Sequence, residues 1–86
     1  MNKRQQRNGM NEANRERLQE VGRRLHDLRT EQQRSVAEVA RAMKVPEEII
    51  LLLEKGEYPQ CELSFLFDLC AFYHTQLEEV LRGLKR

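Results

Sequence analysis

Residues 35–56, SVAEVARAMKVPEEIILLLEKG, decide the fold. Ser35 and Glu38 fit a capping box, in which each side chain accepts a backbone N–H from the other residue, so a helix should begin just after Ser35. That helix must stop before Pro46, because the residue preceding a proline is pushed into extended backbone, and Pro46 suits the first turn of another helix. Gly56 is a good C-terminal cap. The stretch therefore predicts a helix, a short turn and a second helix.

Five apolar residues run without a break from Ile49 to Leu53, in the middle of the second of these helices. Each residue of a helix is rotated by about 100° from the one before, so five in a row cover the whole circumference. One face can pack on a core. The run therefore raises the question of what the opposite face contacts.

Apolar residues at helical spacing predict three further helices. The first should span about residues 11 to 33, with Asn11 or Asn14 as its cap. Thr75 and Glu78 fit a second capping box at the start of the last helix. No segment alternates with a period of two, which indicates an all-α fold. The apolar positions are Leu18, Val21, Leu25 and Leu28 in the first helix, Leu63, Leu66, Phe67, Leu69, Cys70, Phe72 and Tyr73 in the fourth, and Leu77, Val80, Leu81 and Leu84 in the fifth.

The composition is that of one folded domain. Of the 86 residues, 40% are apolar and 34% are charged, and the net charge of +1 does not by itself indicate nucleic acid, since DNA-binding domains are usually basic. No apolar run approaches the roughly 18–20 residues that span a bilayer, and no signal peptide is visible. We therefore expect a cytoplasmic protein that makes no membrane contact.

No catalytic, cofactor or metal site is expected. Cys61 and Cys70 lack the spacing of a zinc site and are interpreted as reduced core thiols, with a lone disulfide as the alternative. His26 and His74 stand alone, and there is no glycine-rich phosphate loop. These features predict that the protein is not an enzyme.

Residues 1–10, MNKRQQRNGM, have no apolar periodicity and include Lys3, Arg4 and Arg7. They are predicted to be a flexible basic N-terminal arm ahead of a domain formed by residues 11–86. Two interpretations of the arm remain open: a solvated tail without a role, or a segment that contacts DNA phosphates.

Four motifs follow one another along the chain: LHDLR at residues 25–29, SVAEVA at 35–40, LEKG at 53–56 and LEEVL at 77–81. Their order and spacing resemble the phage-repressor and Cro type of helix-turn-helix, the xenobiotic-response-element-like (XRE) family, over about residues 21–82. The resemblance implies a compact, lambda-repressor-like domain of five helices. It also implies that the second helix lies over the DNA backbone, that the third enters the major groove, and that Ile50 and Leu53 turn into the core.

The chain departs from the family pattern where DNA contacts would be made. Val36 stands in place of the family's Gln, and Lys44 in place of the turn glycine, which requires a left-handed backbone at a cost of about 1–2 kcal/mol. Leucine can only touch a thymine methyl group, and a carboxylate can accept from cytosine N4 but is usually repelled by phosphates. The outer face of the third helix carries Glu47, Glu48, Leu51 and Leu52.

Leu51 and Leu52 form an apolar patch on this face, and such patches mark contacts. Three accounts remain open. The patch meets a partner protein or a second copy of the chain, or it is covered by the first helix or the N-terminal arm, or it meets DNA weakly while basic residues supply the affinity. Glu47 and Glu48 also have a structural interpretation, because acids in a first turn favour the helix dipole by about 0.3–1 kcal/mol each.

Basic residues around the helix pair are candidates for holding DNA phosphates, although the same charges could be a solvated face paired with neighbouring acids. These candidates are Arg34, Ser35, Arg41, Lys44 and Lys55, with Ser35 acting through backbone N–H groups. The apolar side of the fifth helix is a candidate for a two-fold homodimer contact. Its residues are Leu77, Val80, Leu81 and Leu84.

The sequence thus predicts a small helix-turn-helix protein that binds double-stranded DNA as a homodimer and regulates transcription in the manner of a repressor. The alternative keeps the fold and drops sequence-specific DNA binding. In that case the third-helix patch docks a protein, and the chain serves as an interaction or adaptor module.

Overall fold

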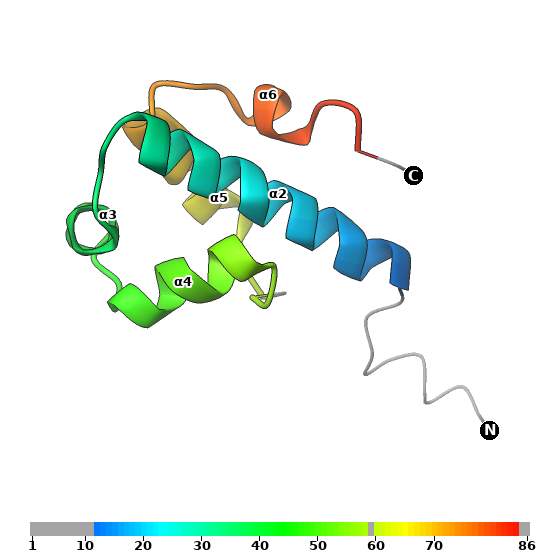
Figure 1. Cartoon of the computed structure of the whole chain (residues 1–86), viewed down its shortest axis with the longest axis horizontal. Helices are drawn as coiled ribbons and strands as arrows, with labels where there is room; N and C mark the ends of the chain where they lie inside the picture. The colour runs from blue at the N-terminus through cyan, green and yellow to red at the C-terminus, as the bar shows by residue number, and fades with distance from the viewer. Residues whose placement is uncertain (1–11, 59, 85–86) are drawn as a thin grey trace.

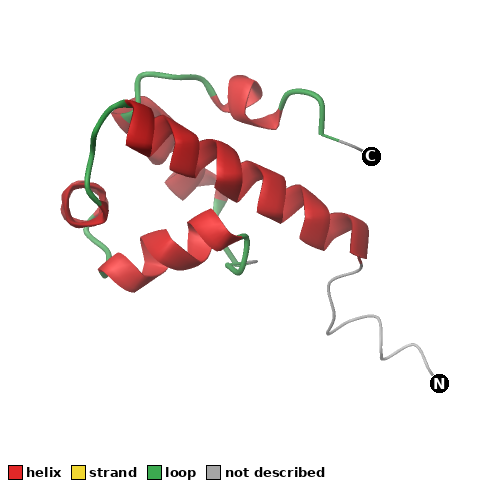
Figure 2. Cartoon of the chain, in the orientation of Figure 1, coloured by secondary structure: helices red, strands yellow, loops and turns green. Residues whose placement is uncertain are grey.

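The computed structural model describes residues 12–58 and 60–84, and within these ranges all regular structure is helical. The helices are α2 (Glu12–Glu31), α3 (Val36–Met43), α4 (Glu47–Lys55), α5 (Leu63–Phe72) and α6 (Leu77–Leu81) (Figure 2). The predicted all-α fold with five helices in the described residues is confirmed. The N-terminal arm predicted for residues 1–10 lies outside the described residues.

The long helix α2 is the element against which the others are arranged. In Figure 1 it crosses the view with α4 on one side and α6 on the other, while α5 lies behind it and α3 is seen almost end-on. Helix α2 packs against α4 and α6, α3 packs against α4 and α5, and α5 packs against α6. The core is therefore enclosed between α2 and the four shorter helices.

One hydrophobic core joins all five helices. The predicted stripe of α2 supplies Val21 and Leu25 as buried residues, while Leu18 and Leu28 on the same stripe are half-buried. Burying a side chain of this size contributes about 1.5–3 kcal/mol, so the stripe is what fixes α2 in the domain. The buried residues are Val21, Leu25, Val39, Ala40, Ile50, Leu53, Leu69, Cys70, Tyr73 and Val80.

The two predicted capping boxes have different outcomes. At the start of α3 the Ser35 hydroxyl accepts the Glu38 N–H (3.0 Å), and the Glu38 carboxylate accepts the Ser35 N–H (3.1 Å), as predicted. The second box is wrong, because the cap of α6 is Gln76 and its side chain makes no capping hydrogen bond. The reason is that Thr75 still belongs to the end of α5, where its N–H donates to the Cys70 carbonyl (2.9 Å).

One of the two predicted caps of the first helix and the predicted end of the last helix need correction. Asn14 is not a cap but lies inside α2, where its side chain accepts a hydrogen bond from Arg17 (2.6 Å), and Asn11 lies outside the described residues. Helix α6 ends at Leu81, because Arg82 takes an extended conformation (φ −61°, ψ 134°), and Gly83 then turns the chain with φ 74°. Leu84 therefore lies beyond the helix and not on its apolar side.

Four helices end in the same left-handed turn, and three of them use a residue other than glycine. Gln33, Lys44 and His74 have φ values of 58°, 63° and 58°, and Gly56 has 75°. In each case the next residue's N–H closes the turn by reaching back five residues, which is the Schellman motif. The sequence predicted this conformation at Gly56, because it is a glycine, and at Lys44, because it replaces the turn glycine of the family pattern. Gln33 and His74 carry no such signal.

Candidate functional site

The candidate site is the pair of helices α3 and α4 with the short turn between them. Lys44 ends α3 in a left-handed conformation (φ 63°, ψ 42°), and the Val45 N–H donates to the Ala40 carbonyl (3.0 Å). Pro46 then opens α4 with extended backbone. The predicted helix, turn and helix are all present, and the turn fixes the direction in which α4 leaves α3.

Helix α4 turns its predicted core residues inward. Ile50 and Leu53 are 1% and 3% exposed, which confirms the register that the family resemblance implied. Leu51 is 43% exposed, whereas Leu52 and Ile49 are half-buried. The apolar patch on the outer face is therefore smaller than the sequence predicted, because Leu52 contributes only part of its surface.

The outer face of α4 ahead of its last residue is acidic and aliphatic. Glu47 and Glu48 are exposed in the first turn, and Leu51 follows one turn later. Of the side chains on this outer face, Lys55 is the basic one and lies in the last turn, at the end of α4 farthest from the turn that joins it to α3. The face therefore offers carboxylate acceptors and one leucine to whatever it meets.

The start of α3 is already occupied by its own side chains. Glu38 accepts the Ser35 N–H and pairs with the Arg34 guanidinium (3.2 Å), and these two contacts lower the pKa of the Glu38 carboxyl. Arg34 also lies over the Phe72 ring, 5.0 Å from its centroid, as in a cation–π contact. A phosphate bound at this helix start would have to compete with the Glu38 carboxylate.

The other three basic candidates are less restrained. Arg41, Lys44 and Lys55 are exposed, and none of them forms a salt bridge within residues 12–58 and 60–84. They lie on α3, on the turn and at the end of α4. The candidate cations thus lie around the helix pair, but two of the five candidate positions are engaged: Ser35 belongs to the capping box, and Arg34 is paired with Glu38.

An ion pair between Arg29 and Glu54 ties the helix pair to α2, and the sequence reasoning had not assigned it. Two hydrogen bonds join the guanidinium to the carboxylate (2.7 and 3.0 Å), and they raise the pKa of Arg29. A third bond runs from Arg29 to the carbonyl of Arg34, just ahead of α3 (3.0 Å). The available signal was that Arg29 lies four residues after the core residue Leu25, on the inward stripe of α2.

The residues predicted for dimerisation lie mostly in or against the core. Val80 is 2% exposed, and Leu77 and Leu84 are half-buried against the core, so Leu81, at 39% exposed, is the one that presents a free apolar side chain. The core buries more of the apolar surface of residues 77–84 than the sequence analysis predicted. Larger exposed side chains lie instead on α5.

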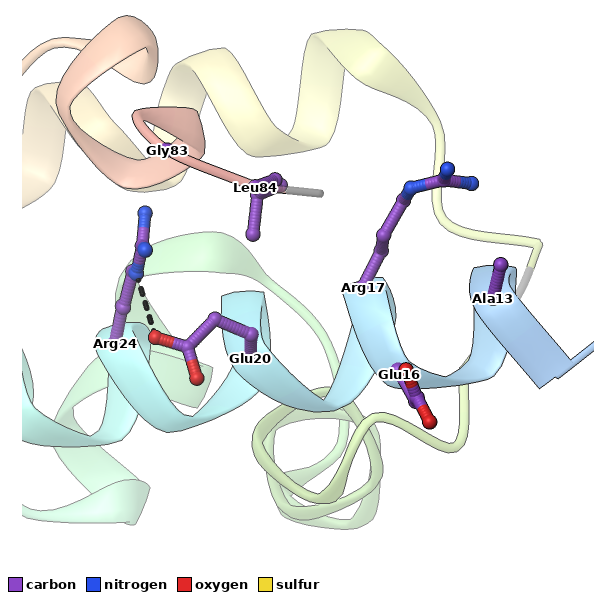
Figure 3. A pocket seen from close by; sticks show the side chains of 7 residues that line it. All are labelled: Ala13, Glu16, Arg17, Glu20, Arg24, Gly83 and Leu84. Carbon is purple, nitrogen blue, oxygen red and sulfur yellow. Dashed lines mark hydrogen bonds and ion pairs between the residues drawn. The ribbon is translucent and has the colours of Figure 1, made fainter. Parts of the chain in front are cut away.

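A hollow of about 410 Å³ separates the first half of α2 from the segment after α6 (Figure 3). At its edge the Arg24 guanidinium donates to the Glu20 carboxylate (2.9 Å) and to the carbonyls of Val80 (2.7 Å) and Arg82 (2.6 Å). Leu84 points toward α2 in this view. Because Arg24, itself paired with Glu20, already holds the end of α6 against α2, we interpret this hollow as part of the packing between these helices and not as a binding site.

Other kinds of site find no support in the described part of the chain. No group of three or more His, Cys, Asp or Glu side chains in residues 12–58 and 60–84 is placed to hold a metal ion. No described helix is both long enough and apolar enough to cross a membrane. Cys61 and Cys70 are free thiols, half-buried and buried respectively, and burial raises the pKa of both.

Comparison with known proteins gives one match. A family model described as a helix-turn-helix domain matches residues 20–82. No curated protein and no solved structure gave a significant match. Domains of this kind are, in general, DNA-binding modules of regulators. The match includes α3, the turn and α4 together with α5 and α6 and most of α2, so the chain belongs to the helix-turn-helix domain family.

Proposed function

We propose that the chain is a transcriptional regulator of the phage-repressor type that binds double-stranded DNA through α3, the turn and α4. The observation that carries this proposal is that α4 leaves the turn with its core residues inward and its outer face in solvent. A helix presented in this way can enter the major groove, while α3 lies over the backbone.

The finer assignment to the XRE type rests on residues that the family pattern shares. Arg29 and Glu54 both belong to the motifs that suggested the resemblance, and they form a bidentate pair that fixes α4 against α2. Gly56, from the same motif, ends α4 with φ 75°. Motif residues that are far apart in the sequence therefore act together to position and end α4. This shared role supports a common ancestry of the chain with the XRE type.

Phosphate contacts should supply most of the affinity. Arg41, Lys44 and Lys55 are the cations available for this, whereas Arg34 would have to leave Glu38 or be shared with it. Base reading by this α4 is limited to acceptance from cytosine N4 by a carboxylate and to contact of Leu51 with a thymine methyl group. We therefore expect binding with a low preference between sequences.

A fluorescence-anisotropy titration on mixed-sequence DNA at several salt concentrations tests this proposal. Three phosphate contacts per subunit predict that log K falls with log salt with a slope of about −3 per subunit. Lys55→Gln should reduce the magnitude of that slope by about one. Arg82→Gln removes the same charge from the far side of α2 and is the matched control, which should leave the slope unchanged.

Absence of binding at about 50 mM salt would contradict the proposal, because the electrostatic part of DNA affinity is strongest there. Equal slopes for the wild type and Lys55→Gln would remove α4 from the interface. Either result would leave the assignment to the helix-turn-helix family intact and would change only the function proposed for this chain.

A second function, protein docking through the outer face of α4, is favoured by the acidic and aliphatic character of that face. Glu47, Glu48 and Leu51 are what a partner would meet, and like charges repel DNA phosphates. In this case Leu51→Ser with Leu52→Ser should abolish partner binding while the helix content, measured by circular dichroism, stays unchanged. If the double variant bound the partner as tightly as wild type does, the Leu51–Leu52 patch would be excluded as the docking surface.

A further inference from the structure

The outward face of α5 exposes more apolar surface than any other described helix. Leu63 and Phe67 are 57% and 54% exposed and lie one helical turn apart. The buried face of α5 adjoins these two residues: Cys70, three residues after Phe67, is 2% exposed, and Leu69 is 1% exposed. Leu63 and Phe67 therefore extend the apolar core face of α5 into solvent, and exposed apolar patches of this kind mark contact surfaces.

A groove of about 530 Å³ lies beside this face, between the end of α3 and α5. Its apolar surface comes from Ala42 and Met43 on one wall and from Ala71 and Phe72 on the other. Phe67 lies four residues before the wall residue Ala71, so the two share one side of α5 and Phe67 borders the groove. The groove is lined by Ala42, Met43, Lys44, Asp68, Ala71 and Phe72.

The two charged residues of the groove have opposite signs and stand on opposite walls. Lys44 belongs to the wall from α3, and Asp68 to the wall from α5. Both are exposed, and neither forms a salt bridge, with the other or with any residue in the described ranges. The groove thus carries one unpaired cation and one unpaired anion around an apolar floor.

We propose that this α3–α5 groove is a two-fold interface with a second copy of the same chain. A two-fold axis through the groove would set Lys44 of each copy against Asp68 of the other. The interface would then contain two equivalent Lys44–Asp68 ion pairs. It would also set each Phe67 side chain against the apolar floor of the facing groove. An acidic or a basic partner, in contrast, would leave one of the two groove charges unpaired.

The interface differs from the one predicted on the last helix. On that helix Val80 is buried in the core, and Leu81 is the predicted contact residue that remains exposed. Aromatic side chains near the centre of an interface carry much of its binding energy, and Phe67 is the exposed aromatic residue beside this groove. The dimer forms without DNA, so it does not depend on the proposed function. In the dimer Lys44 pairs with Asp68, which leaves Arg41 and Lys55 as the cations available to DNA phosphates.

Sedimentation equilibrium of the full chain without DNA, over a range of concentrations, is the test. Wild type should show a concentration-dependent monomer–dimer equilibrium. Phe67→Ser should weaken the dimer by about 30-fold or more, since two such side chains are lost from each interface. Leu81→Ser, the matched control on α6, should leave the dissociation constant unchanged. Circular dichroism verifies that the variants keep their helix content.

Charge reversal gives a sharper readout that a merely structural role would not produce. Lys44→Asp and Asp68→Lys should each weaken self-association by about tenfold, because two like-charged contacts replace two favourable ones. Aspartate is among the residues that tolerate the left-handed backbone at position 44. The double variant, and an equimolar mixture of the two single variants, should recover association to within about threefold of wild type.

Three results would overturn the inference. The first is a chain that remains monomeric up to about 1 mM, a concentration at which even a weak dimer forms. The second is a dimer weakened by Leu81→Ser and not by Phe67→Ser, which would place the contact on α6. The third is a double charge variant that stays as weak as either single one. Because DNA is absent, none of these results bears on the anisotropy titration, and a failure there would leave this dimer untouched.

Discussion

At the scale of single residues, the Arg29–Glu54 pair shows how one contact sets the position of α4. Their side chains are 13% and 7% exposed, and their hydrogen bonds join residues 25 positions apart. The pair thus holds the last turn of α4 on α2, while the third bond of Arg29 holds the entry to α3. Geometry at the candidate interface depends on this one guanidinium.

Arg29→Ala should lower the free energy of unfolding by about 2–3 kcal/mol, because it leaves the Glu54 carboxylate, whose side chain is only 7% exposed, without its counter-charge. Urea unfolding followed by circular dichroism measures the loss. Arg23→Ala is the matched control: Arg23 also lies on α2 in an ion pair, but its side chain is 58% exposed. Equal destabilisation by the two variants would show that the Arg29 pair is not special.

At the scale of elements, the packing of α2 on α4 depends on Gly22, a buried glycine inside a helix. A Cβ added there would lie 2.5 Å from the carbonyl oxygens of Leu53 and Glu54, closer than real contacts allow. The two backbones therefore approach as closely as they do because residue 22 has no side chain.

Gly22→Ala should lower the free energy of unfolding by about 1–3 kcal/mol, although alanine is the better helix former by about 1 kcal/mol. The physical reason is that α2 and α4 must move apart, which loosens the core behind Ile50 and Leu53. Thermal unfolding of this variant beside Arg15→Ala, a change on the exposed part of α2, separates the two effects. A Gly22→Ala protein as stable as wild type would mean that the helices tolerate the added methyl group.

At the scale of the whole molecule, Tyr73 joins the ends of several elements. Its ring is buried, 2% exposed, and packs edge-on against Phe72 at 5.3 Å. The Gln32 side chain, just beyond α2, donates to its carbonyl (2.8 Å). Burial raises the pKa of Tyr73 to about 12, and the nearby Glu54 carboxylate adds to the shift. Ionisation of this one phenol therefore acts on the whole core.

The neutral phenol is favoured in the folded state, so its contribution to stability is complete below pH 10 and is lost as the pH rises from about 10 toward 12. We expect wild type to lose about 2 kcal/mol of unfolding free energy from this group over that range. In urea unfolding at each pH, Tyr73→Phe should lose less than wild type. Tyr58→Phe, which removes the other tyrosine hydroxyl, should follow wild type, and parallel curves for all three proteins would contradict the assignment.

Much of the fold could be predicted from the sequence, because its signals are local. The Ser35 box, the proline at position 46 and the glycine at position 56 each act on backbone within one or two turns. The box and the glycine gave correct boundaries, whereas Pro46, predicted in the first turn of α4, is its cap, and the helix begins one residue later at Glu47. Spacing placed Ile50 and Leu53 in the core for the same reason. The capping-box rule failed at Thr75, because the Thr75 N–H is hydrogen-bonded to the Cys70 carbonyl at the end of α5.

By itself, then, the sequence determined the helices, their order and the inward stripes of α2 and α4. Tertiary structure alone decided which charges pair across α2 and α4, how closely Gly22 lets those helices approach, and that the free apolar surface lies at Phe67 and not at Val80. The physical reason is range. Capping, turn formation and helical periodicity act between neighbours in the chain, whereas burial and ion pairing act between neighbours in space, which the chain acquires only when all five helices share one core.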